Sequence, residues 1–229
     1  MIDRLAEAVR DNAEWCDLMC RVHGSPGTFT GRAWTNAVRT PLFYPDAVTL
    51  SPAATAADVL DRIDSGPGAS VKDSFATLDL PGFDVLFEAQ WLWRSAPART
   101  GPAARQRPDA GIGWEVVGDA ATLADWERTA FGEVHGLFPA SLLDHVEILC
   151  GRIDGEIVCG SVLTASGAVA GVSNVFASGC DLDAAWAGTV AMAASLFPGR
   201  PLVGYESDPE AALSHGFTPI GPLRVWLRR

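Results

Sequence analysis

The stretch EILCGRIDGEIVCGSVLTASGAVAGVSNVFA, residues 147–177, decides the fold of the second half of the chain. An Asp-Gly pair at 154 and 155 separates two apolar runs, and such a pair is the strongest short-range signal of a β-hairpin. A Ser-Gly pair at 166 and 167 then leads to a third apolar run. The stretch therefore predicts three consecutive antiparallel strands.

Helices and strands alternate after this stretch. Asp183 followed by Ala, Trp, Val, Met and Leu predicts a helix over 183–197, which ends before Pro198. The runs at 201–206 and 221–228 read as strands, with a short helix between them that Gly216 stops. A helix between two strands allows them to run parallel, so we expect strands 168–177 and 201–206 to be parallel neighbours.

The residues before the three strands complete this second region. GWEVV at 113–117 alternates like a strand, and Asp119 caps a helix that runs through Phe131. A short helix follows near Ser141. The order is strand, two helices, three antiparallel strands, helix, strand, helix, strand, which predicts an α+β fold with a mixed, largely antiparallel sheet flanked by helices.

The first region gives mixed signals. Residues 3–22 predict an amphipathic helix, residues 41–50 a turn that leads into a strand, 54–63 a short helix and 83–94 an aromatic strand. Three prolines and many small residues make 95–110 read as a linker. We therefore expect an N-terminal α/β region over 1–95, a linker over 96–110 and a second domain over 111–229.

Composition excludes several classes of protein. The chain has 229 residues, of which 48% are apolar and 20% charged, and this balance excludes a disordered protein. Its net charge of −11 provides no basic stripe, so we expect no nucleic-acid partner and no anionic membrane surface as partner. The amphipathic start has no apolar core of a secretory signal, which indicates a cytoplasmic protein.

An uncharged run at 157–180 is long enough to cross a bilayer. The polar residues Ser161, Thr164, Ser173 and Asn174 and the Ser-Gly turn within it favour two strands of a water-soluble domain instead.

The order of elements over 111–229 resembles the GNAT superfamily of N-acetyltransferases. The closing run ESDPEAALSHGFTPIGPLRVWL, residues 206–227, is similar to the family's final short helix, which ends at Gly-Phe, and its final apolar strand. Asp73, Gly82, Phe83 and Trp93 are spaced in the first region much as Asp208, Gly216, Phe217 and Trp226 are at the end. This echo fits either a GNAT-like half in a tandem protein or chance recurrence.

The resemblance implies that acetyl-CoA binds where the third antiparallel strand separates from its parallel neighbour. The pyrophosphate would rest on backbone N–H groups at the start of the following helix. The implied cofactor-binding residues are Val175, Phe176, Ala177, Cys180, Asp183, Ala184, Ala185 and Trp186.

The chain departs from the family's loop pattern, R/Q-x-x-G-x-G/A. Cys180 replaces the Arg or Gln, and Asp183 replaces a Gly. Asp183 is expected to cap its own helix and to repel a phosphate. Either the cofactor binds differently or it does not bind. The aromatic ring of Trp186 either faces the cleft or packs against the sheet.

The implied chemistry is removal of a proton from an amine and donation of one to a thiolate. The family's Tyr before Gly-Phe is Ala212 here, so Tyr205 and Glu206 are the nearest alternatives. Burial that raised the pKa of Glu206 toward neutrality would make it a general base, and the alternative is an exposed carboxylate at a strand end. His135 falls in the stretch that admits the acceptor in the family, and a structural role is the alternative.

Cysteines offer two further sites, and we expect neither to form. Cys16, Cys20 and His23 share one helical face, but no fourth zinc ligand is evident, so ordinary core and no metal are expected. Cys150 and Cys159 should lie opposite each other across the hairpin, where a disulfide is conceivable and two reduced thiols are favoured.

These observations favour an acyl-CoA-dependent N-acetyltransferase that uses acetyl-CoA and acts on a small-molecule amine or peptide. The alternative is a catalytically silent GNAT-fold module that binds a ligand or another protein. A homodimer is one expectation for its assembly.

Overall fold

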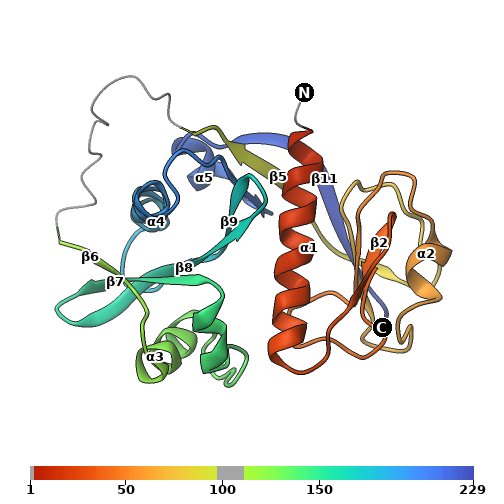
Figure 1. The fold of residues 1–229 in the computed structure, drawn as a ribbon, viewed down its shortest axis with the longest axis horizontal. Coiled ribbons are helices and arrows are strands. Elements are labelled where there is room, and N and C mark those ends of the chain that lie inside the picture. Colours follow the sequence, from red (N-terminus) through yellow and green to blue (C-terminus); the bar gives the residue numbers. More distant parts are fainter. Residues whose placement is uncertain (1–2, 97–110) are drawn as a thin grey trace. The chain divides into compact units, whose positions relative to one another are not determined.

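The computed structural model describes residues 3–96 and 111–229, and it confirms the α+β fold (Figure 1). Apart from Ala96, the predicted linker over 96–110 lies outside the described residues. The chain forms two compact units. Unit 1 comprises Met1–Leu92, Tyr205–Asp208 and Pro219–Arg229, and unit 2 comprises Trp93–Gly204 and Pro209–Thr218. The predicted domain boundaries at 95 and 111 stay a prediction.

The helices and strands have the following bounds. The helices are α1 Arg4–Val22, α2 Ala56–Leu60, α3 Ala120–Phe131, α4 Leu182–Leu196 and α5 Glu210–Ser214, with a 3-10 helix, η1, at Ala140–Asp144. The strands are β1 Thr28–Phe29, β2 Ala33–Thr35, β3 Ala47–Thr49, β4 Ser70–Asp73, β5 Asp84–Arg94, β6 Gly113–Val116, β7 Glu147–Ile153, β8 Glu156–Ser166, β9 Val169–Ala177, β10 Leu202–Glu206 and β11 Thr218–Leu227.

The three antiparallel strands form as the sequence predicts. In unit 2 the strands lie in the order β10, β9, β8, β7, β6. Asp154 and Gly155 have φ angles of 51° and 89° at the β7–β8 turn, the left-handed pair that a two-residue hairpin requires. The uncharged run at 157–180 forms mainly β8 and β9. Among the residues that the structure describes, no helix is both long and apolar enough to span a membrane.

The parallel pairing of β9 and β10 is also confirmed. Ala170 pairs with Leu202, and Gly171 with Val203. The helix between these strands, α4, begins at Leu182, one residue before the predicted start. It provides the crossover that a parallel pair needs.

Two helices cover opposite faces of the unit 2 strands (Figure 1). On the α3 face the indole of Trp126 donates to the Leu149 carbonyl at 2.8 Å, and Gly160 leaves room for this ring. On the α4 face the Trp114 ring lies directly against Gly188. A glycine in the middle of a helix is usually destabilising, and the close approach of this ring explains it here.

Unit 1 repeats much of the order of elements seen in unit 2. Its strands lie in the order β1, β2, β3, β4, β11, β5, and β3 runs parallel to β4 with α2 between them. Neighbouring pairs β1–β2 and β2–β3 are antiparallel. The last strand of the chain, β11, pairs antiparallel with β4, so the first and last parts of the sequence share one unit. The origin of the first region as a GNAT-like half stays a prediction, which this order supports.

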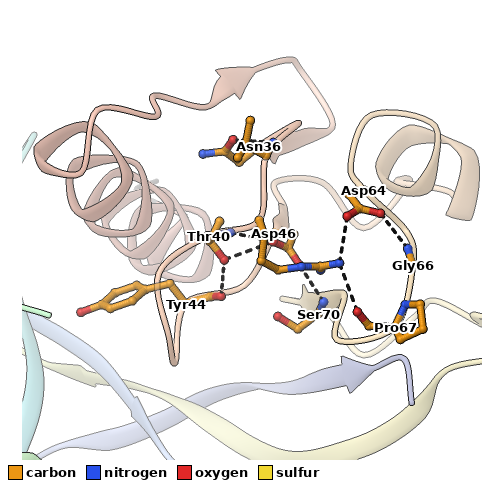
Figure 2. Close-up of polar contacts among 10 residues, drawn as sticks. Asn36, Thr40, Tyr44, Asp46, Asp64, Gly66, Pro67 and Ser70 are labelled. Carbon is orange, nitrogen blue, oxygen red and sulfur yellow. Dashed lines mark hydrogen bonds and ion pairs between the residues drawn. The ribbon is translucent and has the colours of Figure 1, made fainter. Parts of the chain in front are cut away.

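A buried carboxylate holds the loop that leads into β3. Asp46 accepts hydrogen bonds from the backbone N–H groups of Thr40 at 3.0 Å and Ser70 at 2.9 Å, and it forms an ion pair with Arg39 at 2.5 Å (Figure 2). The Thr40 hydroxyl donates to the Tyr44 carbonyl at 2.6 Å. Asp46 is 1% exposed, so these donors are needed to offset its lost hydration.

The contact between Gly188 and Trp114 generates a test of how α4 is seated. A Cβ at position 188 would lie 2.0 Å from the Trp114 ring, so Gly188→Ala should lower the free energy of unfolding by about 1–3 kcal/mol despite its better helix propensity. Urea unfolding measures the change. In a Trp114→Ala background the same substitution should be neutral or stabilising. Equal losses in both backgrounds would contradict this packing.

Candidate active site

The edge of β9 changes geometry just where the family resemblance places the cofactor. Gly160 pairs with Phe176 and Val162 with Ser173, so β9 carries one more residue than β8 over this interval. Asn174 lies in this bulge with a φ of 52°. Val175, Phe176 and Ala177 follow it and are half-buried, which leaves the end of β9 accessible beyond its pairing with β10.

The two parallel strands lie close together at Gly204. A Cβ there would lie 2.7 Å from the carbonyl oxygen of Val172, a distance that a side chain would not tolerate. The glycine therefore allows β10 to reach the point where β9 bulges, and Tyr205 and Glu206 follow directly in the chain.

The start of α4 differs from the expectation that Asp183 caps the helix. The N-cap residue is Asp181, and its side chain accepts no hydrogen bond from the first turn. Asp183 is the second helical residue, and its Oδ1 lies 2.9 Å from Nε2 of His215, the C-cap residue of α5. The capping prediction was wrong because the helix begins at Leu182, so Asp183 lies inside the first turn, where its carboxylate meets His215. The first-turn N–H groups are thus left without a side-chain cap from Asp181.

The next predicted cofactor residues are part of the core. Ala184, Ala185 and Trp186 are buried, and the Trp186 ring packs edge-to-face on Phe217 with ring centroids 5.2 Å apart. Of the two interpretations of Trp186, packing is the one the structure shows. The side chains of these residues therefore belong to the core, and the N–H group of Ala185 donates to the Asp181 carbonyl at 3.2 Å.

Cys180 lies in the turn that connects β9 to α4. Its sulfur is 3.8 Å from the carbonyl oxygen of Val158 on β8, and it is partly exposed. The structure therefore places Cys180 at the edge of the same junction as Val175–Ala177 and the start of α4, all within unit 2.

Glu206 meets the condition set for a general base. Burial, with a smaller contribution from the charge of Asp208, raises the pKa of Glu206 to about 7. A carboxyl group with this pKa is half ionised at neutral pH, so it can both accept and release a proton there. Ala212, at the family's tyrosine position, is buried and has no group to exchange protons.

Tyr205 is held by a buried lysine that the sequence analysis missed. Lys72 Nζ donates to the Tyr205 hydroxyl at 3.2 Å and to Asn12 Oδ1 at 2.8 Å, and it lies 4.3 Å from the centroid of the Tyr205 ring. Burial opposes the charge of Lys72, but the neighbouring Tyr205 and Cys16 raise its pKa above the ordinary value. The only signal in the sequence was a lysine inside the short run ASVKD.

His135 lines a pocket of about 500 Å³ within unit 2. The wall of the pocket is formed by α3, including Leu123 and Arg128, and by the segment from His135 to Ala140. The carboxylate of Glu127 holds this segment, since it accepts from the N–H groups of Gly136 at 2.9 Å and Phe138 at 2.8 Å. His135 thus lines a cavity of unit 2, and its role toward an acceptor stays a prediction. Glu206 belongs to unit 1.

The structure also shows where the cysteines of the considered zinc site and of the hairpin lie. Among the described residues no group of three or more His, Cys, Asp or Glu side chains could hold a metal ion. On the helical face considered for zinc, His23 is exposed whereas Cys16 and Cys20 are buried. The expected register of the hairpin was wrong by one residue. A bulge between Gly151 and Arg152 pairs Cys150 with Gly160, so Cys150 and Cys159 point to opposite faces.

The raised pKa of Glu206 predicts a pH-dependent stability. Between its ordinary value of 4.5 and about 7, the folded chain keeps a proton that the unfolded chain releases, so the free energy of unfolding falls as pH rises through this window. Glu206→Gln removes this effect. The variant should gain up to about 3 kcal/mol over the native chain above pH 7, and this gain should vanish toward pH 4.5.

Urea unfolding at about pH 5 and about pH 8 measures this difference. Glu210→Gln, an exposed carboxylate on α5, is the matched control and should show no such pH trend. A gain for Glu206→Gln that is the same at both pH values would contradict the raised pKa of the half-buried Glu206.

Comparison with solved structures places this arrangement in a known fold. A GCN5-related N-acetyltransferase from Kribbella flavida matches with a TM-score of 0.60 and 14% identity over 96% of this chain and 95% of its own. A GNAT-family protein from Novosphingobium aromaticivorans matches with a TM-score of 0.58 and 16% identity over 96% and 99%. A functionally unknown conserved protein from Staphylococcus epidermidis matches with a TM-score of 0.59 and 9% identity over 88% and 92%.

These matches extend the predicted resemblance from residues 111–229 to nearly the whole chain. No protein-family model matches the sequence, and no curated protein matches it. At identities of 9–16% the likeness concerns the fold. The chain therefore has the fold of the GNAT N-acetyltransferases, as its sequence predicted.

Proposed function

We propose that the chain is an acyl-CoA-dependent N-acetyltransferase that transfers an acetyl group to an amine. The observation that carries the proposal is the junction of β9, α4 and β10 in unit 2. There a bulged strand end, a parallel neighbour and a helix start without an N-cap side-chain bond come together. This is the arrangement at which the family resemblance implies that acetyl-CoA binds.

The residues at this junction fit an anionic cofactor in one respect and oppose it in another. The backbone N–H groups at the start of α4, including those of Asp183 and Ala184, would hold the pyrophosphate. The exposed Asp183 carboxylate opposes it, but His215 lies against that carboxylate and would offset its charge when protonated. Backbone N–H groups of Val175–Ala177 would polarise the thioester carbonyl. Bound acetyl-CoA supplies the activated acetyl group.

Glu206 and Tyr205 are the residues proposed to move protons. Glu206 would take the proton that the attacking amine loses, for which a pKa of about 7 is suitable. The Tyr205 hydroxyl accepts a hydrogen bond from Lys72, so its own hydrogen is left to donate to the leaving thiolate. The C–N bond forms, the C–S bond breaks, and the products are an amide and the free thiol. His135 is proposed to line the path of the acceptor.

Calorimetric titration with acetyl-CoA at low salt tests the cofactor site. The native chain should bind weakly, and Asp181→Asn with Asp183→Asn should bind about tenfold to a hundredfold more tightly, since about 1–3 kcal/mol of repulsion is removed. Asp125→Asn is the matched control, because Asp125 is also an exposed helical carboxylate in an ion pair. Folded proteins that bind no acetyl-CoA in either form would support the silent ligand-binding module instead.

Release of free thiol from acetyl-CoA in the presence of a panel of primary amines tests the proton transfers. The rate with an accepted amine should rise with pH through an apparent pKa near 7, and Glu206→Gln should lose about a hundredfold or more of it. Glu210→Gln should keep the native rate and profile. An unchanged rate in Glu206→Gln would remove Glu206 from the proposed chemistry.

A further inference from the structure

Glu127 on α3 is a buried carboxylate without a cationic partner. Buried charges are usually paired, and two others in this chain are: Asp46 forms an ion pair with Arg39, and Asp17 with Arg21. Glu127 is 6% exposed, and within residues 3–96 and 111–229 no Lys, Arg or His lies within ion-pair distance of it. Its negative charge is therefore balanced only by hydrogen bonds.

The Glu127 carboxylate lies at the wall of the pocket of about 500 Å³ described above. Its two oxygens accept from the N–H groups of Gly136 at 2.9 Å and Phe138 at 2.8 Å, and all three residues line the pocket. Each carboxylate oxygen has two lone pairs, so each has one left after these bonds. The pocket wall thus contains a negative group that has further capacity to accept hydrogen bonds.

The rest of the wall suits an alkyl chain that ends in a cation. Two basic residues also line the pocket, but Arg128 is paired with Asp125 at 2.9 Å with its side chain 62% exposed, and His135 is exposed. Solvent weakens exposed charges more than buried ones, so Glu127 has the strongest charge effect on a ligand. The apolar lining residues are Ala120, Leu123, Ala124, Phe138 and Ala140.

An aromatic cluster connects this pocket with the end of β9. The Phe138 ring stacks on Trp126 with centroids 5.3 Å apart, and the Trp126 ring packs edge-to-face on Phe176 with centroids 5.2 Å apart. Phe176 belongs to the strand end that is proposed to hold the thioester. Within unit 2, one indole ring therefore contacts both the pocket wall and that strand end.

We propose that this pocket binds one protonated amino group of an alkyl diamine, with the Glu127 carboxylate as its partner. The ammonium group donates to the Glu127 oxygens, and the methylene chain lies against the alanine and leucine side chains. A protonated nitrogen has no lone pair, so the bound nitrogen cannot attack a thioester. A substrate held in this way needs a second amino group, which is the one acetylated. That last step rests on the proposed function, whereas the binding does not.

NMR titration of the native full-length chain without acetyl-CoA tests the binding. The probes share one chain length: 1,5-diaminopentane, 1-aminopentane, 1-pentanol and pentanoate, at low salt and about pH 7, where the amines are protonated. Both amines should shift the amide signals of Gly136 and Phe138, which donate to Glu127. The alcohol and the carboxylate should bind about tenfold more weakly or not at all. Equal binding of the alcohol, tighter binding of the carboxylate, or no binding of either amine would overturn the proposal.

Variants separate this pocket from general attraction of cations to an acidic protein. Ala124→Leu places a larger side chain in the pocket wall and should weaken amine binding about tenfold or more, whereas Ala121→Leu, on the same helix and outside the wall, should not. Glu127→Gln should lose the preference for the amine over the alcohol. If that variant does not fold, the two alanine variants decide, and native binding by Ala124→Leu would contradict the proposed site.

Release of free thiol from acetyl-CoA distinguishes this inference from the proposed function. Diamine binding in the pocket without release of thiol would support the pocket and count against the acetyltransferase. Release that is equal with 1,5-diaminopentane and 1-aminopentane, and equal in the native chain and Ala124→Leu, would support the acetyltransferase and overturn the pocket as its acceptor site.

Discussion

The parallel pairing of β9 with β10 is the constraint on which the candidate site depends. Two strands that follow each other through a tight turn must be antiparallel, so a parallel pair requires a long crossover, and α4 supplies it. The helix can lie on the strands only because Gly188 leaves room for the Trp114 ring. β10 can follow β9 to its bulge only because Gly204 leaves room for the Val172 carbonyl. The two glycines, Gly188 and Gly204, thus allow the close packing that positions the end of β9, the start of α4 and the end of β10.

The electrostatics of the junction come from pairs that form across elements. Asp183 lies in the first turn of α4 and pairs with His215 at the end of α5. The Asp183 carboxylate would repel a phosphate at the proposed site, and the adjacent His215 ring can offset this repulsion. Glu206 presents the converse case. Burial and the charge of Asp208 raise the pKa of Glu206 to about 7. The Asp183 carboxylate is paired with His215, whereas the Glu206 carboxyl group is suited to exchanging protons.

Unit 1 shows how the same order of elements can serve different ends. In unit 1 the parallel strands β3 and β4 are connected by α2, a helix of five residues. In unit 2 the parallel strands β9 and β10 are connected by α4, a helix of fifteen residues. The loop before β3 is held by Asp46, and β4 contributes Lys72, which fixes the hydroxyl of Tyr205. The C-terminal strand β11 also belongs to this unit, because it pairs with β4. The first region therefore also supplies Lys72 and Asn12, which hold the Tyr205 side chain at the end of β10.

The sequence by itself determined the elements whose signals are local. The Asp-Gly turn, the cap at Asp119, the stop at Gly216 and the amphipathic pattern of 3–22 each depend on residues a few positions apart, and all of them are confirmed. Only the tertiary structure decided the partner of Asp183 and the register of Cys159 in the hairpin. The one-residue register shift between Gly151 and Arg152 pairs Cys159 with Gly151 instead of Cys150. The packing of α5 places His215 beside Asp183. Lys72 was missed for the same reason, since its partners Asn12 and Tyr205 are far apart in the chain. Such contacts depend on register and on packing between distant segments, which no local pattern of residues encodes.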